Sequence, residues 1–256
     1  MRAVEVWIAG LDPWAIALTF AVAMTAFFAL GSIRGRRSPA PAGDNGAKFT
    51  DASMALLGLL LAFTFSMALN RYDERRQAMV AETNAIGDLY TSATMLPEPT
   101  RSKFQTILAD YTQHRLEGRR QRALRNEPER VMGEARQMQA QATDIVAAMV
   151  EERSPIIVPL LNNLNEVTSS YATYLAAYQE RLPVIVLVLL LLGAMIPAFL
   201  MGRQGALNTV HRSGPVSFAL LVTLVIYVTF DLNQPSGGLI TVGDEPLVQL
   251  LKSMAK

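Results

Sequence analysis

Four long apolar segments dominate this sequence of 256 residues, and none of them contains a charged residue. They cover residues 13–33, 52–69, 182–201 and 215–230. A helix of about 20 apolar residues crosses the ~30 Å hydrocarbon core of a bilayer. The first three segments reach or approach this length. The fourth, with about 16 residues, is expected either to cross with little tilt or to end inside a protein-lined region. The sequence therefore predicts an all-α membrane protein with about four transmembrane helices.

The stretch between the second and third apolar segments is polar and is expected to lie in water. Most of the charged residues of the chain fall between Arg71 and Arg181. Prolines near residues 97, 128 and 155 divide this stretch into four helical segments with apolar residues at helical spacing. Four helices joined by short loops predict a long antiparallel helical bundle inserted between the second and third transmembrane helices.

Two of these helices are expected to continue from the membrane without a break. No Gly or Pro occurs between Leu59 and Ile86, so the second span should extend into the bundle. The last bundle helix, with apolar residues from Ile157 to Tyr178, is expected to run directly into the third span at Leu182. Another bundle helix carries an apolar stripe over residues 104–111, followed by a basic run over residues 115–125.

The chain is thereby divided into four parts. Residues 1–70 form a first transmembrane helix pair, 71–181 the extramembrane bundle, 182–232 a second transmembrane pair, and 233–256 a C-terminal turn and amphipathic helix. Pro235, Gly237 and Gly238 predict the turn because they do not continue a helix. The amphipathic helix should begin near Asp244 and lie against the membrane surface or against the bundle.

Positive charges in the short loops predict the orientation in a cell membrane. Cytoplasmic loops are enriched in Lys and Arg, whereas long domains cross largely regardless of charge. The two short linkers contain Arg34, Arg36, Arg37, Lys48, Arg203 and Arg212. The linkers are therefore expected in the cytoplasm and the large middle domain on the non-cytoplasmic side. Arg71, Arg75, Arg76 and Arg181, at the membrane edge of that domain, oppose this assignment.

The composition gives little support for catalysis or for nucleic-acid binding. The chain contains no Cys, and its only two histidines, His114 and His211, have no second ligand at metal-binding spacing. No phosphate-binding glycine loop or nucleophile motif is present. A net charge of +1 gives no basic surface for nucleic acid. We expect no enzyme activity, no catalytic or metal-binding residue and no cofactor.

Polar and small residues on two spans are candidates for pore or gating positions. Thr223, Tyr227 and Asp231 recur every four residues on the fourth span, and Ser66 and Asn70 do so on the second. A pore lining is one interpretation. The other is that Thr223 and Tyr227 hydrogen-bond to neighbouring helices while Asp231 marks the water interface. Small residues at spacing four also favour close helix contacts in lipid, as in the series Ala17, Ala21, Thr25, Ala29 and the series Gly58, Ala62, Ser66.

Charged residues follow the second span on the same predicted helix. Arg71, Arg75, Arg76, Glu82 and Asn84 make up this group. They predict a salt-bridged stalk or, where repeated subunits multiply the charge, an anion-attracting collar at a pore mouth.

Two sequence blocks resemble the bestrophin-like domain of a family of integral membrane proteins. The first block leads from the second span through Arg71-Tyr-Asp-Glu-Arg75-Arg76 to Glu82-Thr-Asn-Ala-Ile-Gly87 and Leu96-Pro97. The second is Asp231-Leu-Asn-Gln-Pro235 with Gly238-Leu-Ile240. The resemblance covers nearly the whole chain and implies a distant likeness to bestrophins, which are oligomeric chloride channels gated by calcium. Bestrophins keep their large domain in the cytoplasm, unlike the orientation predicted here, and no acidic calcium clasp stands out.

The leading functional hypothesis is a homo-oligomeric ion channel or pore-like protein of bestrophin-like type. Its partners would be the lipid bilayer, further copies of the chain and a small ion. The alternative is a membrane-anchored sensory or protein-interaction module that presents a helical bundle and performs no catalysis.

Overall fold

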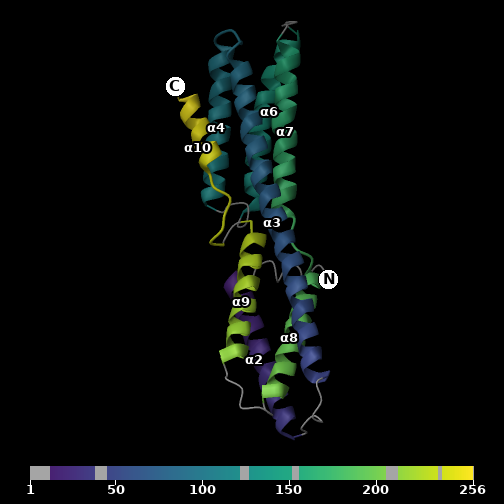
Figure 1. The fold of residues 1–256 in the computed structure, drawn as a ribbon. Helices are drawn as coiled ribbons and strands as arrows, with labels where there is room; N and C mark the ends of the chain where they lie inside the picture. The colour runs from purple at the N-terminus through teal and green to yellow at the C-terminus, as the bar shows by residue number, and fades with distance from the viewer. Residues whose placement is uncertain are drawn as a thin grey trace. The chain divides into compact units, whose positions relative to one another are not determined.

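The computed structural model describes residues 12–37, 45–121, 127–151, 156–205, 213–235 and 238–255. These residues form eight helices, labelled in Figure 1, and no strand. The chain divides into two compact units. We call Met1–Tyr72 with Arg181–Ile240 the span unit, and Asp73–Glu180 with Thr241–Lys256 the polar unit.

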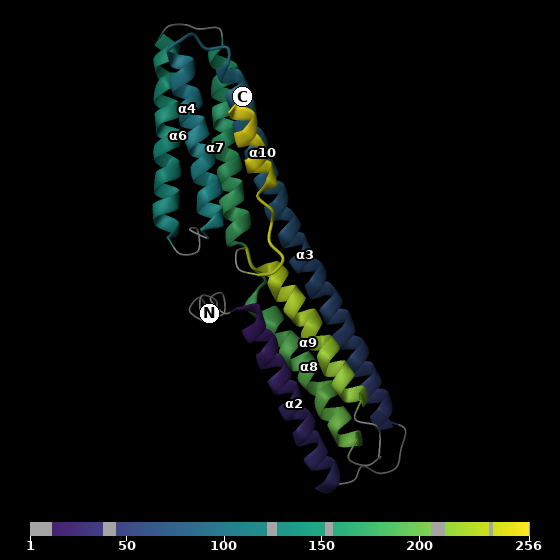
Figure 2. The ribbon, with the colours of Figure 1, turned by 90° about the vertical axis from the view of Figure 1, so that its left-hand side faces the viewer.

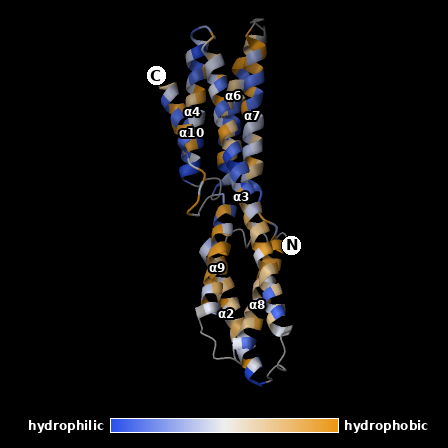
Figure 3. Cartoon of the chain, viewed as in Figure 1, coloured by the Kyte–Doolittle hydropathy of each residue, from blue (hydrophilic) through white to orange (hydrophobic). Residues whose placement is uncertain are grey.

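The span unit contains the four predicted membrane helices. They are α2 (Pro13–Arg37), the first half of α3 (Asn45–Ala93), α8 (Val184–Gly205) and α9 (Ser213–Asn233). Four helices of the described chain are long and apolar enough to cross a membrane, which confirms this prediction. Figure 3 shows the apolar colouring of these segments. Phe20, Met24, Leu57, Ala194 and Ile226, contributed by all four helices, are buried in one apolar core.

Helices α2 and α8 touch through glycine. A Cβ atom added to Gly31 would collide with the backbone carbonyl of Phe199, and one added to Gly202 would collide with that of Phe28. Only residues without side chains allow two helices to approach this closely, a common basis for helix contact in membranes. In the predicted series on α2, Ala17 is buried, whereas Thr25 and Ala29 are exposed.

The polar unit joins the second half of α3 to α4 (Thr100–Arg120), α6 (Pro128–Glu151), α7 (Ile157–Gln179) and α10 (Glu245–Met254). Its core includes Phe104, Leu108 and Leu160 of the predicted apolar stripes, together with Ile86 and Val146, which belong to no predicted stripe. Figure 2 shows α4, α6 and α7 running side by side within this unit. Of the two locations predicted for the C-terminal helix, the structure has the second, because α10 packs beside α4 and buries Leu247 completely.

One predicted continuity is confirmed and the other is wrong. Helix α3 runs unbroken from Asn45 to Ala93. Helix α7, by contrast, ends at Gln179, and Glu180 is extended (φ −68°, ψ 130°) before α8 begins at Val184. Pro183 has no N–H and disfavours a helical residue before it, which ends the helix here. The backbone N–H of Leu182 instead donates to the side-chain oxygen of Asn233, at 3.0 Å.

Candidate functional site

Asp231 holds the chain that follows the fourth span. It lies in the last turn of α9, with only 1% of its surface exposed. Its Oδ1 accepts a hydrogen bond from the N–H of Leu239 at 2.9 Å, and its Oδ2 accepts one from Ile240 at 2.7 Å. A Cβ on Gly238 would lie 2.5 Å from the same carboxylate, so a larger residue here would have to displace it. Asp231 is therefore buried and fully engaged, and it fixes the predicted turn.

The other predicted residues of this region are Pro235 and Gly237 of the turn and Thr223 and Tyr227 of the α9 stripe. Pro235 lies in a bend and is half-buried, while Gly237 lies outside the described residues. Tyr227 is half-buried and lies one turn before Asp231. Thr223, one turn earlier, is also half-buried. The α9 stripe thus ends on a buried acceptor.

The predicted stripe on α3 is exposed, unlike the stripe on α9. Gly58, Ala62, Ser66 and Asn70 are all exposed in the single chain, and a Cβ at Gly58 would meet nothing within 4 Å among the described residues. Next to this stripe, an apolar groove of about 530 Å³ lies between α3 and α9. A membrane helix in this chain thus presents a small and polar face that no neighbouring helix of the described chain covers.

The five predicted collar residues do not share one environment. Arg75 and Glu82 are buried, Arg71 is half-buried, and Arg76 and Asn84 are exposed. The exposed Asn84 borders a polar groove between α3 and α10. Glu82 finds its partner on another helix rather than on α3 itself.

Glu82 and Arg115 form an ion pair in the interior of the polar unit. Nε of Arg115 donates to Oε1 of Glu82 at 2.6 Å and Nη2 donates to Oε2 at 2.9 Å, with both side chains 1% exposed. The guanidinium lies over the rings of Tyr171 and Tyr174, 4.5 and 4.8 Å from their centres. The hydroxyl of Tyr111 also donates to Glu82, at 3.4 Å. A buried charge needs such bidentate and aromatic partners to offset its lost hydration.

The protonation of this cluster is fixed by its surroundings. Burial alone would lower the pKa of Arg115, but the Glu82 carboxylate outweighs that effect and raises the pKa above its ordinary value. Burial, followed by the charge of Glu82, raises the pKa of Tyr111. Arg115 therefore stays charged and Tyr111 stays neutral near physiological pH. The arrangement is suited to holding α3, α4 and α7 together.

Arg119, one turn after Arg115 on α4, binds the segment that leads into α10. Its Nη1 donates to the Tyr174 hydroxyl at 2.8 Å, its Nε to the Asp244 carboxylate at 2.9 Å, and its Nη2 to the Val242 carbonyl at 2.9 Å. Burial alone would lower the pKa of Arg119, but the nearby Tyr174 and Asp244 raise it. The sequence interpretation missed both arginines because they open a basic run.

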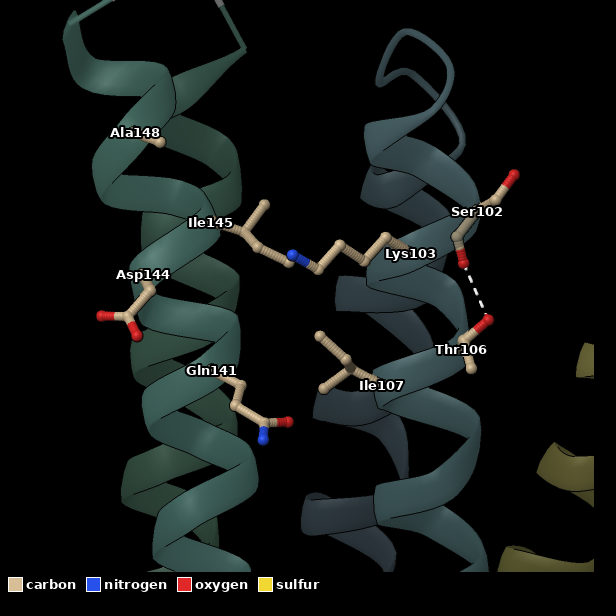
Figure 4. A pocket seen from close by; sticks show the side chains of 8 residues that line it. All are labelled: Ser102, Lys103, Thr106, Ile107, Gln141, Asp144, Ile145 and Ala148. Carbon is tan, nitrogen blue, oxygen red and sulfur yellow. Dashed lines mark hydrogen bonds between the residues drawn. The ribbon is translucent and has the colours of Figure 1, made fainter.

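An open groove of about 690 Å³ lies between α4 and α6. Figure 4 shows Ile107 and Ile145 lining it from opposite helices, with Lys103 reaching from α4 towards Ile145 and Asp144 pointing away from α4. Its polar groups do not converge on one point. Among the described residues, no group of His, Cys, Asp or Glu is arranged to hold a metal. His114 lies 3.1 Å from Glu134, and His211 is outside the described residues.

These features define a multi-pass helical membrane protein in which buried polar residues fasten distant parts of the chain. The family model of the bestrophin-like domain matches residues 15–247, so the chain belongs to the bestrophin-like domain family. The resemblance inferred from the two sequence blocks is thus confirmed. Comparison with curated proteins and with solved structures found no match.

Proposed function

We propose that this protein is a homo-oligomeric, pore-like membrane protein in which α3 of every copy faces a shared axis. The observation that carries the proposal is the exposed face of Gly58, Ala62, Ser66 and Asn70 on α3. Small residues gain little from lipid but allow close helix contact, and polar side chains in a span favour a protein or water-filled environment.

The spans also expose large apolar side chains, such as Phe63 on α3, Ile185 on α8 and Leu220 on α9, which suit contact with lipid. On α3 the small and polar face adjoins such apolar positions, so one part of its surface suits lipid and another part suits a neighbouring copy. The bundle between the second and third spans would then be the extramembrane domain of the assembly, without catalytic activity and on the non-cytoplasmic side.

Cysteine substitution provides a direct test, because the natural chain has no cysteine background. In planar bilayers, we expect Ser66→Cys to conduct and to be blocked by a small water-soluble thiol reagent. The matched control is Leu220→Cys, at a position 69% exposed on α9, which should conduct without being blocked. Absence of conductance in any salt or pH gradient, or equal behaviour of the two variants, would contradict the proposal.

The groove between α4 and α6 favours a second candidate, a sensory or protein-interaction module. It combines the apolar Ile107 and Ile145 with a polar rim, as small-ligand and peptide grooves do. A partner would have to carry the signal onward. Purification from native membranes that recovers only copies of the chain itself would count against this candidate.

A further inference from the structure

We propose that residues Leu239–Asp244 are a coupling strap, which links the docking of α10 to the structure at the end of α9. The strap is fastened at its first end by Asp231 and at its second end by Arg119. This inference does not depend on whether the protein conducts ions.

The first fastening is strong because the acceptor is charged and buried. Both oxygens of Asp231 accept backbone N–H groups, and charge-assisted hydrogen bonds are about twice as strong as neutral ones. Gly238 packs directly against the carboxylate, which leaves no room for another side chain. Leu239 and Ile240 are therefore held to the last turn of α9.

The second fastening uses one side chain to hold two points of the strap. Arg119 binds the Val242 carbonyl and the Asp244 carboxylate while the Tyr174 hydroxyl fixes its orientation. Asp244 is the residue immediately before α10. The start of α10 is thereby held to α4.

Only Thr241 separates the two fastened ends. A residue spans at most about 3.5 Å of extended chain, so a single residue limits how far apart the two fastened ends can move. A displacement of either end therefore pulls on the other.

The helical structure of α10 depends on its contacts with the rest of the polar unit. It has 10 residues, and helices shorter than about 12–15 residues are marginal by themselves in water. Its fully buried Leu247 and the hydrogen bond from Tyr90 to the Met254 carbonyl hold it on the polar unit. Release and unfolding of α10 form a local opening reaction of the kind that amide hydrogen exchange measures.

The test is amide hydrogen exchange on the full-length chain in detergent, comparing Leu239 and Ile240 with the amides of α10. Arg119→Gln should accelerate exchange in α10 directly and at Leu239 and Ile240 through the strap. Asp231→Asn should accelerate exchange at Leu239 and Ile240 directly and in α10 through the strap, because coupling between two sites is reciprocal. Couplings of this kind amount to about 5-fold to 150-fold. If one of the two variants does not fold, the other still gives one direction of the test.

Two further variants separate the strap from general destabilisation. Arg120→Gln is the matched control, because Arg120 is 59% exposed and 3.8 Å from Asp244, and it should change neither region. Inserting Gly-Ser-Gly after Thr241 should keep both fastenings but remove the distant effect of Arg119→Gln. The proposal is overturned if Arg119→Gln does not accelerate exchange at Leu239 and Ile240 in the chain without the insertion. It is also overturned if that acceleration persists in the chain with the insertion.

Discussion

At the residue scale, the buried polar side chains of this protein hold segments that lie far apart in the sequence. Glu82 binds Arg115 on another helix, Asp231 binds the N–H groups of Leu239 and Ile240, and Asn233 binds that of Leu182. Glu82 belongs to the first family block, and Asp231 and Asn233 belong to the second. Both blocks therefore have a physical role in connecting segments, apart from any role in transport.

The ion pair in the polar unit gives the first prediction at this scale. Glu82→Leu leaves the Arg115 guanidinium buried without its counter-charge, which should lower the free energy of unfolding by about 3–5 kcal/mol. The double variant Glu82→Leu with Arg115→Met should recover most of that loss, since no buried charge remains. Chemical unfolding followed by circular dichroism in detergent measures both.

A matched control for this experiment is Glu117→Gln on α4. Glu117 is exposed and accepts a hydrogen bond from Gln113 on the same helix, so the change should stay within about 0.5 kcal/mol. A double variant no more stable than Glu82→Leu alone would show that the pair contributes more than charge compensation.

At the element scale, the contact of α2 with α8 depends on the absence of side chains. Gly31 and Gly202 each face a backbone carbonyl of the opposite helix. Gly58, in contrast, lies on an exposed face of α3. Glycines of different spans thus have different environments, which sequence spacing alone does not distinguish.

These glycines give a prediction for helix packing. Gly31→Ala places a methyl group against the Phe199 carbonyl and should cost about 1–3 kcal/mol of stability, because neither backbone can easily move away. Gly58→Ala, in open space, should leave the fold intact and improve helix propensity slightly. Thermal unfolding of the two variants in the same detergent compares them. Equal effects of the two substitutions would mean that the close approach to Phe199 does not restrict the residue at position 31.

The sequence was sufficient to predict the spans, the stripes of the polar unit and the unbroken α3, because these depend on local hydrophobic periodicity. It contained the signal for the break before α8, Pro183, but the last bundle helix was expected to run directly into the third span. Arg115 and Arg119 were missed for a related reason. They lie one and two turns after Tyr111 and so continue the buried face of α4, but a charged residue is ordinarily assigned to solvent.

At the scale of the whole molecule, each unit has its own apolar core, and the chain passes between the units three times. The crossings are the continuous α3, the extended residues before Val184, and the strap at Thr241. They differ in stiffness, because only the first is an uninterrupted helix. A change in one unit therefore has a direct covalent route through α3 to the other.

The orientation of these units across the membrane is the last prediction. Lys and Arg in the short linkers favour a cytoplasmic location for Ala47 and a non-cytoplasmic one for Thr143 on α6. Both positions are exposed and therefore accessible to a labelling reagent. In intact cells, a membrane-impermeant maleimide should label Thr143→Cys, and it should label Ala47→Cys only after permeabilisation. The reverse pattern would place the polar unit in the cytoplasm, as in bestrophins, and would mean that the arginines at residues 71–76 outweigh the linkers in setting the topology.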